Sequence, residues 1–282
     1  MARSAAARAA GIALLLVVGA LVPPGCGGDP SSAPVCDGAR PFAIPGLAAG
    51  STPTLTEVEQ LIERLVEVYG GADRLSRLAF RRIEDLYLVR TGNPLGNELI
   101  GTLWTRPDQS VRTLLQYSSG ETEERVLKRG EPWVRPRFGS LVRATGASVQ
   151  HVTWDWEVAR LPAILLEAEA LRPLAAEVVD ERLLVGVAVE LPQLKPPFEV
   201  WIDPAGPLLI ETRVVLPITA DLAMRTSAHQ RQRFGDWRRV DGLLFPHRRE
   251  TIVDGERIGL GEARSFTVDG QVTDADLEPL AR

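Results

Sequence analysis

The chain has 282 residues, with 32 Lys or Arg against 37 Asp or Glu, and a formal net charge of −5 at pH 7. Nucleic-acid binding depends on clustered Lys and Arg against phosphates, so an acidic chain is a poor candidate for that class of partner. The length that remains after the N-terminal segment fits one domain, because all-β domains commonly reach this size.

Residues 1–25 have the layout of a secretory signal peptide. Arg3 and Arg8 form a short basic start, and an apolar run extends from Gly11 to Val22. That run is too short for a transmembrane helix, which needs about 20 residues, and it is typical of the apolar region of a signal peptide. Removing residues 1–25 takes away two arginines and no acid, which changes the net charge from −5 to −7.

Cys26 follows the apolar run and a small residue, and this arrangement resembles the processing site of bacterial lipoproteins. The resemblance implies cleavage before Cys26 and a lipid anchor on it, although Pro23 and Pro24 differ from the aliphatic and small residues of that pattern. The residue after Cys26 is Gly27 and not the Asp that favours inner-membrane retention in enteric bacteria, and this resembles an outer-membrane address. The alternative is ordinary signal cleavage nearby, with Cys26 and Cys36 forming a disulfide in an oxidising compartment.

Residues 26–53 are rich in Pro, Gly, Ser and Ala and have little periodicity. This composition predicts a flexible tether between the membrane and the folded part. Residues 54–282 are the predicted domain.

The domain is predicted to begin with a helix. Thr54 with Glu57, or Thr56 with Glu59, has the spacing of a capping box. Apolar residues then recur every three or four positions, which gives one apolar stripe. Gly70-Gly71 is expected to end the helix as a C-terminal cap.

From Phe80 the apolar period changes to two, which is typical of strands. Turn-forming pairs such as Pro107-Asp108 and Ser119-Gly120 separate the extended segments. Arg112 and Gln116 alternate with apolar neighbours, so one face of this sheet is expected to contact water. Arg135 to Gly146 is expected to be a loop. The strands expected here are Ile83–Arg90, Glu98–Thr105, Ser110–Tyr117 and Glu123–Lys128.

Trp154 to Leu171 interrupts the strands with a helical pattern. Pro162 is expected to begin a second short helix, where its missing N–H costs nothing, and Arg172-Pro173 is expected to close it. A sheet as wide as the one predicted curls, and its apolar concave face must be covered. This segment is the one candidate inside the sheet region, so it is predicted to be a lid.

Strands resume after the lid and bring the total to about ten or eleven in meander order. Asp241-Gly242 and Asp254-Gly255 predict tight hairpin turns, because Gly accepts the positive φ of primed turns. Pro246 near the start of a strand predicts an edge or a bulge. The strands expected here are Leu183–Leu191, Phe198–Asp203, Leu208–Leu216, Arg225–Trp237, Leu243–Val253 and Arg257–Val268.

This pattern resembles the half-barrel superfamily of bacterial lipoprotein carriers and receptors (LolA/LolB-like), which includes the sensor domain of periplasmic sigma-factor regulators. The resemblance rests on the helix ending at Gly70-Gly71, the meander, and the segments Phe198–Pro204, Phe234–Pro246 and Val268–Leu280. It implies an α+β, mostly β fold: a wide curved antiparallel sheet forming an incomplete β-barrel, with an N-terminal helix and a central helical lid on the concave face. It also implies an apolar cavity that can hold acyl chains. A pattern of strand and turn residues is more specific for fold than for function.

Catalytic and metal motifs are not recognisable in the sequence. There is no Gly-x-Ser-x-Gly elbow and no His-Glu-x-x-His. The histidines His151, His229 and His247 lack metal-ligand spacing and are interpreted as surface or strand residues. His247 lies in the mixed-charge run Arg248-Arg249-Glu250, which predicts a solvated face. We expect no enzyme, no cofactor and no metal.

The predicted lid supplies the candidate ligand contacts. Trp154 and Trp156 are expected to contact an acyl chain, because amphipathic aromatic rings favour boundaries between water and apolar surface. The alternative is that these residues only pack the lid on the sheet. Each large apolar side chain contributes about 1.5–3 kcal/mol when buried, so a ligand must replace most of the lid contacts in order to open the site. The six candidates are Trp154, Trp156, Leu161, Ile164, Leu165 and Leu171.

The sequence therefore predicts a cell-envelope protein that faces the periplasm and is anchored to the outer membrane through a lipid on Cys26. Its expected ligand is a lipid or the acyl chains of another lipoprotein. A buried acyl chain gains about 0.8 kcal/mol per CH₂, so an enclosed apolar face is sufficient without catalysis. The alternative is an envelope sensor or protein-interaction domain on the same fold, with an envelope protein as its partner.

Overall fold

The computed structural model describes residues 41–90, 93–217, 227–268 and 272–279. The chain divides into two units, Met1–Pro34 and Val35–Arg282, and the described residues all belong to the second. The predicted signal peptide, Cys26, Cys36 and the tether up to residue 40 lie outside them. No helix in the described ranges is long and apolar enough to span a bilayer.

Two runs of strands make up the described sheet, one before and one after the central helical segment. The first run is β1 (Phe80–Arg90), β2 (Asn93–Arg106), β3 (Ser110–Tyr117), β4 (Thr122–Lys128), β5 (Glu131–Arg135) and β6 (Val142–Arg143). The second run is β7 (Ala170–Pro173), β8 (Glu177–Val179), β9 (Arg182–Leu191), β10 (Leu194–Asp203), β11 (Leu208–Pro217), β12 (Ser227–Val240), β13 (Leu243–Val253) and β14 (Glu256–Val268).

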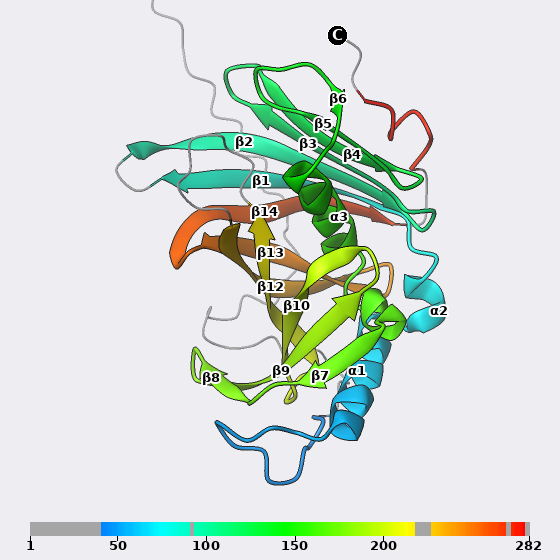
Figure 1. Cartoon of the computed structure of the whole chain (residues 1–282), viewed down its shortest axis with the longest axis vertical. Helices are drawn as coiled ribbons and strands as arrows, with labels where there is room; N and C mark the ends of the chain where they lie inside the picture. Colours follow the sequence, from blue (N-terminus) through cyan, green and yellow to red (C-terminus); the bar gives the residue numbers. More distant parts are fainter. Residues whose placement is uncertain (1–40, 91–92, 218–226, 269–271, 280–282) are drawn as a thin grey trace, which may run out of the picture. The chain divides into compact units, whose positions relative to one another are not determined.

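Within the described residues these strands form one 14-stranded antiparallel sheet in the order β6-β5-β4-β3-β2-β1-β14-β13-β12-β11-β10-β9-β7, with β8 paired to β9 off this path (Figure 1). The two meanders meet in the middle of the sheet, where β1 pairs with β14. β6 and β7 remain at opposite edges, so the sheet is not closed into a barrel. The α+β, mostly β, incomplete-barrel prediction is confirmed.

The first helix, α1 (Leu55–Tyr69), is confirmed together with its predicted caps. Thr54 and Glu57 form the capping box, so that pair rather than Thr56 and Glu59 begins the helix. Gly70 ends α1 with a φ of 128°. A Cβ on Gly70 would lie 2.4 Å from Cδ2 of Leu243, so glycine also allows the end of α1 to approach the β12–β13 hairpin. The short α2 (Ala72–Leu75) then leads into β1.

The central helical segment differs from the prediction in its bounds. Helix α3 runs over Ala147–Ala159, and a 3-10 helix, η1, follows over Ala163–Glu167, with Pro162 as its N-cap. The helix thus begins seven residues before Trp154. Its N-cap, Gly146, provides no side-chain cap, which left no start signal in the sequence.

Leu171, Arg172 and Pro173 do not close a helix, as the sequence pattern predicted, but belong to strand β7. This short strand pairs with the edge of β9, where Leu171 lies opposite Val189. Pairing with a strand already present satisfies the backbone groups of a segment whose local pattern does not specify a strand. The prediction of a lid that continues to Leu171 is therefore wrong in its last residues.

Helix α3 contacts both halves of the sheet, namely β3, β4 and β5 on one side and β10 and β11 on the other. Trp154 belongs to the apolar cluster of α1 and β9–β11, whereas Trp156 and Val152 belong to the cluster of Phe80 and Phe245. A helix that is buried on opposite sides does not show a single apolar stripe. This double burial is a further reason why the start of α3 was missed.

Both predicted Asp-Gly turns are confirmed. Asp241 and Gly242 have φ values of 50° and 79°, and Asp254 and Gly255 have 49° and 87°, as primed turns require. Pro246 lies in a part of β13 that pairs with β12 but not yet with β14, because the β13–β14 ladder begins at Arg248. Only the start of β13 is therefore an edge, and the rest of the strand pairs on both sides.

The described end of the chain packs on the outer face of the first meander. Leu277 is fully buried there, and Arg112 donates a hydrogen bond to the backbone carbonyl of Asp276 at 2.8 Å. Arg106 pairs with Asp274 at 2.6 Å. The tail therefore covers β2 and β3 on the side opposite α3.

Candidate functional site

A cavity of about 570 Å³ lies between the concave face of the sheet and α3. Its lining is mainly apolar and comes from α1, α2, α3 and strands on both sides of the β1–β14 pair. Aromatic side chains contribute much of this surface, among them Phe80, Trp154, Phe234, Trp237 and Phe266. The volume falls within the range of about 300–1,000 Å³ that is usual for small-molecule sites.

The six predicted ligand contacts separate into two groups. Trp154 and Leu161 line the cavity, together with Val158 of α3. Trp156, Ile164 and Leu165 are buried in the core and do not line it. Leu171 packs against the larger core cluster from β7. A ligand in the existing cavity would reach the first group directly, whereas contact with the others stays a prediction that requires α3 and η1 to move.

Three charged side chains form a cluster on the concave wall of the cavity. Arg249 of β13 donates a hydrogen bond from Nη2 to Oε1 of Glu84 at 2.6 Å. Arg82 of β1 donates to the same oxygen at 3.3 Å. All three line the cavity, and the exposed fractions of their side chains are only 13% for Arg82, 7% for Glu84 and 22% for Arg249. We call Arg82, Glu84 and Arg249 the inner cluster.

Two glycines make room for the carboxylate of the inner cluster. Gly101 of β2 pairs with Glu84, and a Cβ there would lie 2.7 Å from Leu86 and 3.2 Å from Cγ of Glu84. A Cβ on Gly261 of β14 would lie 3.1 Å from Oε2 of Glu84. The missing side chains let Glu84 lie over both neighbouring strands, within reach of the arginines.

The charge of Glu84 is maintained by its partners. Burial raises the pKa of this carboxyl, but the guanidinium groups of Arg249 and Arg82 outweigh that effect and lower the pKa below its ordinary value. The carboxylate is therefore ionised at neutral pH. The inner cluster then holds two positive charges and one negative charge.

A second ion pair joins α3 to the sheet beside the inner cluster. Arg125 of β4 donates to Asp155 of α3 at 3.0 and 3.2 Å, and Thr113 lies 3.4 Å from the same carboxylate. Arg125 and Asp155 both line the cavity. This pair is balanced in charge and positions the helix over the concave face.

The histidines have no metal-site geometry in the described structure. No group of three or more His, Cys, Asp or Glu side chains in the described residues has the geometry to hold a metal ion. Nε2 of His151 lies 2.8 Å from the carbonyl oxygen of Pro217 at the cavity wall. His247 packs on Phe266, and burial lowers the pKa of its imidazole. The solvated face predicted for His247 is therefore wrong, because both ring nitrogens are buried and the ring lies against Phe266.

The neighbouring run Arg248-Arg249-Glu250 was predicted to lie on one solvated face, whereas in the structure its side chains point to both faces of the sheet. Arg248 and Glu250 pair with each other at 3.0 Å, while Arg249 between them lines the cavity. Strand alternation points successive side chains to opposite faces, and this signal could have separated Arg249 from its neighbours. The same alternation places Phe80, Arg82, Glu84 and Leu86 on one face of β1.

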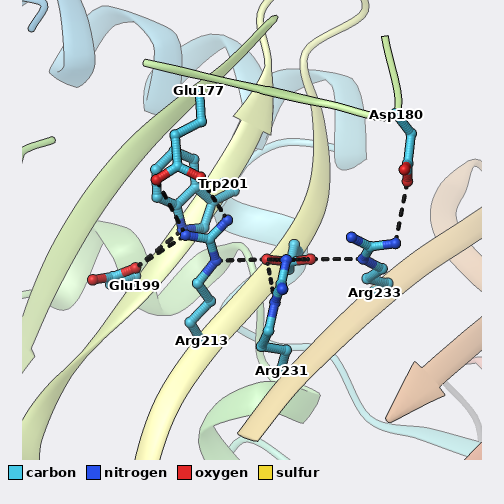
Figure 2. A network of polar contacts seen from close by, with 8 residues as sticks. Glu177, Asp180, Glu199, Trp201, Arg213, Arg231 and Arg233 are labelled. Carbon is cyan, nitrogen blue, oxygen red and sulfur yellow. Dashed lines mark hydrogen bonds and ion pairs between the residues drawn. The ribbon is translucent and has the colours of Figure 1, made fainter. Parts of the chain in front are cut away.

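The opposite face of the sheet carries another buried glutamate, Glu211 of β11, which is fully buried. It accepts hydrogen bonds from Nε of Arg213 at 2.6 Å, from Arg231 at 2.8–3.0 Å and from Nε of Arg233 at 2.8 Å (Figure 2). Gln232 and Phe234 line the cavity, so Arg231 and Arg233, which alternate with them, point away from it. We call Glu211 and its three arginines the outer cluster.

Further acids surround the outer cluster, as Figure 2 shows. Arg213 pairs with Glu177 at 3.0 Å and approaches Glu199 at 3.9 Å, and Arg233 pairs with Asp180 at 3.2 Å. The guanidinium of Arg213 lies 4.0 Å from the ring centroid of Trp201. With four acids against three arginines, the outer cluster and its neighbours contain no unbalanced positive charge.

Comparisons with known proteins support the fold. No family model matches the chain, and no curated protein sequence matches it. A LolA superfamily protein from Nitrosomonas europaea matches in structure with a TM-score of 0.52 at 9% identity, covering 78% of this chain and 97% of that chain. A DUF1329 family protein from Desulfovibrio piger has a TM-score of 0.51 at 14% identity, covering 78% and 95%. The chain has a LolA-like half-barrel fold, as its sequence pattern predicted.

Proposed function

We propose that this protein is a bacterial cell-envelope protein that binds lipid, or the acyl chains of lipoproteins, in its half-barrel cavity and performs no catalysis. The observation that carries the proposal is the cavity of about 570 Å³, enclosed between α3 and the concave sheet and lined mainly by apolar side chains. Burial of an acyl chain gains about 0.8 kcal/mol per CH₂, so several methylenes supply useful affinity without a reactive group.

The existing space changes the expected role of the helical segment. Trp154, Val158 and Leu161 already face the cavity, so a chain can contact them while α3 stays in place. The ion pair between Arg125 and Asp155 stabilises that position of the helix. On this proposal α3 is a wall of the site, and the mutual exclusion of lid and ligand expected from the sequence is not required.

The envelope location and the lipid anchor belong to the same proposal. They rest on the basic start, the short apolar run and Cys26 in the sequence. Labelling of cells with a radioactive fatty acid is expected to mark the natural protein and to leave a Cys26→Ser variant unlabelled. Equal labelling of the two would remove Cys26 as the anchor, and no labelling of either would favour ordinary signal cleavage.

Ligand binding is tested on the full chain carrying Cys26→Ser, so that no lipid is attached covalently. The protein is purified without detergent. Solvent extraction and mass spectrometry are expected to identify bound lipid, and a fluorescent fatty acid is expected to bind with saturation. Empty protein that takes up no probe would overturn the proposal and favour the alternative, an envelope sensor or protein-interaction domain.

Two Val→Trp variants locate the site. Val158→Trp on α3 projects a large ring into the cavity, and it is expected to weaken probe binding at least about tenfold, or about 1.4 kcal/mol. Val178→Trp is the matched control, because Val178 lies on β8 with 59% exposure, away from the cavity lining. Equal effects of the two substitutions on probe binding would place the ligand elsewhere.

A further inference from the structure

We propose that the cavity selects amphiphiles with an anionic head, a carboxylate or a phosphate, and that Arg82 and Arg249 bind this head. The inference rests on the proposed function and adds the chemical class of its ligand. An uncharged lipid of the same chain length would fill the apolar part of the cavity and leave the two arginines without the additional acceptor.

Charge is unevenly balanced along the cavity wall. Three arginines and three acids line the cavity, so its wall as a whole is neutral, but the charges are unevenly spread. Arg125 pairs with Asp155, and the carboxylate of Asp254 accepts a hydrogen bond from the backbone N–H of His229 at 3.0 Å. In the inner cluster, by contrast, the single carboxylate of Glu84 faces two guanidinium groups. One net positive charge remains beside apolar surface, where it attracts an anion more strongly than it would in water.

The two arginines of the inner cluster supply more hydrogen-bond donors than Glu84 can accept from. A guanidinium has five N–H groups in a planar fork, suited to a carboxylate or a phosphate. Both arginines donate to the same oxygen, Oε1 of Glu84. Nε of Arg82 is buried and has no hydrogen-bond partner, although Oε2 of Glu84 lies 3.3 Å away. Nε itself is shielded from the cavity, so an oxyanion would accept from the cavity-facing N–H groups of the two forks and would add a second acceptor to a cluster in which buried donors without acceptors are costly.

Apolar side chains surround the inner cluster on the cavity wall. Phe80 and Leu86 occupy the same face of β1 on either side of Arg82 and Glu84, and Phe234 lies opposite Arg249 on the paired strand. The charged group is therefore flanked by apolar wall. A ligand with one charged end and one long apolar end matches that arrangement.

The test compares three probes of equal chain length on the full chain with Cys26→Ser: a fatty acid, an alkyl phosphate and a fatty alcohol. Affinities are measured at pH 7 by displacement of a fluorescent fatty acid. At least one anion is expected to bind about tenfold more tightly than the alcohol, or about 1.4 kcal/mol. The acid and the phosphate arms show which head the arginines prefer.

Two substitutions on one strand separate the inner cluster from the rest of the sheet. Arg249→Gln is expected to weaken binding of the preferred anion about tenfold and to leave the alcohol unchanged. Arg248→Gln is the matched control, since Arg248 is the preceding residue, points to the opposite face and pairs with Glu250. Arg249→Lys keeps the charge and loses the fork, so an intermediate affinity is expected, and this variant decides the question if Arg249→Gln does not fold.

Glu84→Gln provides a test with the opposite sign. Removal of the competing carboxylate leaves both guanidinium groups to the ligand, so the preferred anion is expected to bind more tightly. A merely structural cluster would lose anion affinity in both Glu84→Gln and Arg249→Gln. Equal binding of anions and alcohol, unchanged in Arg249→Gln, would overturn this inference and leave the proposed function standing. Failure of all three probes to bind would overturn the proposed function itself.

Discussion

Two buried glutamates, Glu84 and Glu211, occupy opposite faces of the same sheet, and both are held ionised by arginines from neighbouring strands. Burial raises the pKa of each carboxyl, and the arginine partners outweigh it, so both pKa values are lower than usual. The difference lies in what surrounds the arginines. Around Glu211, further acids balance the arginines, whereas around Glu84 two arginines share one carboxylate and face the cavity.

The outer cluster explains how several strands are joined. Arg213 of β11 lies between Glu211 and Glu177 of β8, and Arg233 of β12 lies between Glu211 and Asp180 in the turn after β8. These contacts connect β8, β11 and β12 on the convex side. Because each arginine has an acidic partner, the outer cluster is interpreted as structural. The comparison indicates that the balance of charge around a buried acid, rather than its burial, separates a structural contact from a candidate binding site.

Substitution of the two glutamates is expected to have the largest effect on stability. Glu211→Gln leaves three arginines around a neutral amide and is expected to lower the free energy of unfolding by about 3 kcal/mol, at the low end for a broken buried pair, because these arginines are partly hydrated. Glu84→Gln is expected to lower the free energy of unfolding by less, since two arginines lose their acidic partner instead of three. Urea denaturation measures both values.

The ligand separates the two variants further. A saturating anionic amphiphile is expected to restore part of the stability of Glu84→Gln, because binding to the folded state alone shifts the unfolding equilibrium. No comparable restoration is expected for Glu211→Gln beyond that seen in the natural protein. Equal restoration in both variants would mean that the two clusters do not differ in access to the ligand.

Two glycine substitutions compare the packing beside each cluster. A Cβ on Gly186 would lie 2.7 Å from Trp201, whose ring also contacts the guanidinium of Arg213, so the ring has little room to move. Gly186→Ala is expected to cost about 2 kcal/mol and to lower the Tm by about 4–8 °C. Gly101→Ala meets Leu86, which borders the cavity and can shift, so a smaller change in Tm is expected. Differential scanning calorimetry would show a reversed order if the inner face were the more tightly packed one.

A third buried glutamate gives the smallest expected effect and the opposite sign. Burial raises the pKa of Glu157 on α3, and the hydrogen bond from Gln193 and the charge of Arg160, 3.8 Å away, do not compensate. A raised folded-state pKa contributes stability below the unfolded value of about 4.3, and this contribution is lost as the pH rises through the folded value. Glu157→Gln is therefore expected to be slightly more stable than the natural protein at pH 7, with the difference disappearing below about pH 4.

For Glu84 and Glu211 the pH dependence runs the other way. Their lowered pKa values contribute stability that is present above about pH 4.3 and lost as the pH falls through the folded values. Acid titration followed by circular dichroism is expected to show a shallower loss of stability in Glu211→Gln than in the natural protein. A shallower loss in Glu157→Gln as well would contradict the assigned direction of its shift.

Much of the fold follows from local patterns in the chain. The bounds of Ser110–Tyr117 and Leu243–Val253 agree with β3 and β13, because period-two alternation and flanking turn residues define a strand locally. The short strands β6, β7 and β8 were not predicted, since two to four residues are too few for a periodic signal.

The sequence by itself determined helix α1, the longer strands, the Asp-Gly turns and the half-barrel class, because strand period, helix caps and Asp-Gly turns act over a few residues. Only the tertiary structure decided which charges meet. Glu84 and Arg249 are 165 residues apart in the chain, and they meet because β1 pairs with β14 and β14 with β13. The same pairing leaves Arg249 inside and Arg248 outside. Local patterns cannot assign charge to a cavity wall, because the wall exists only after distant strands have joined.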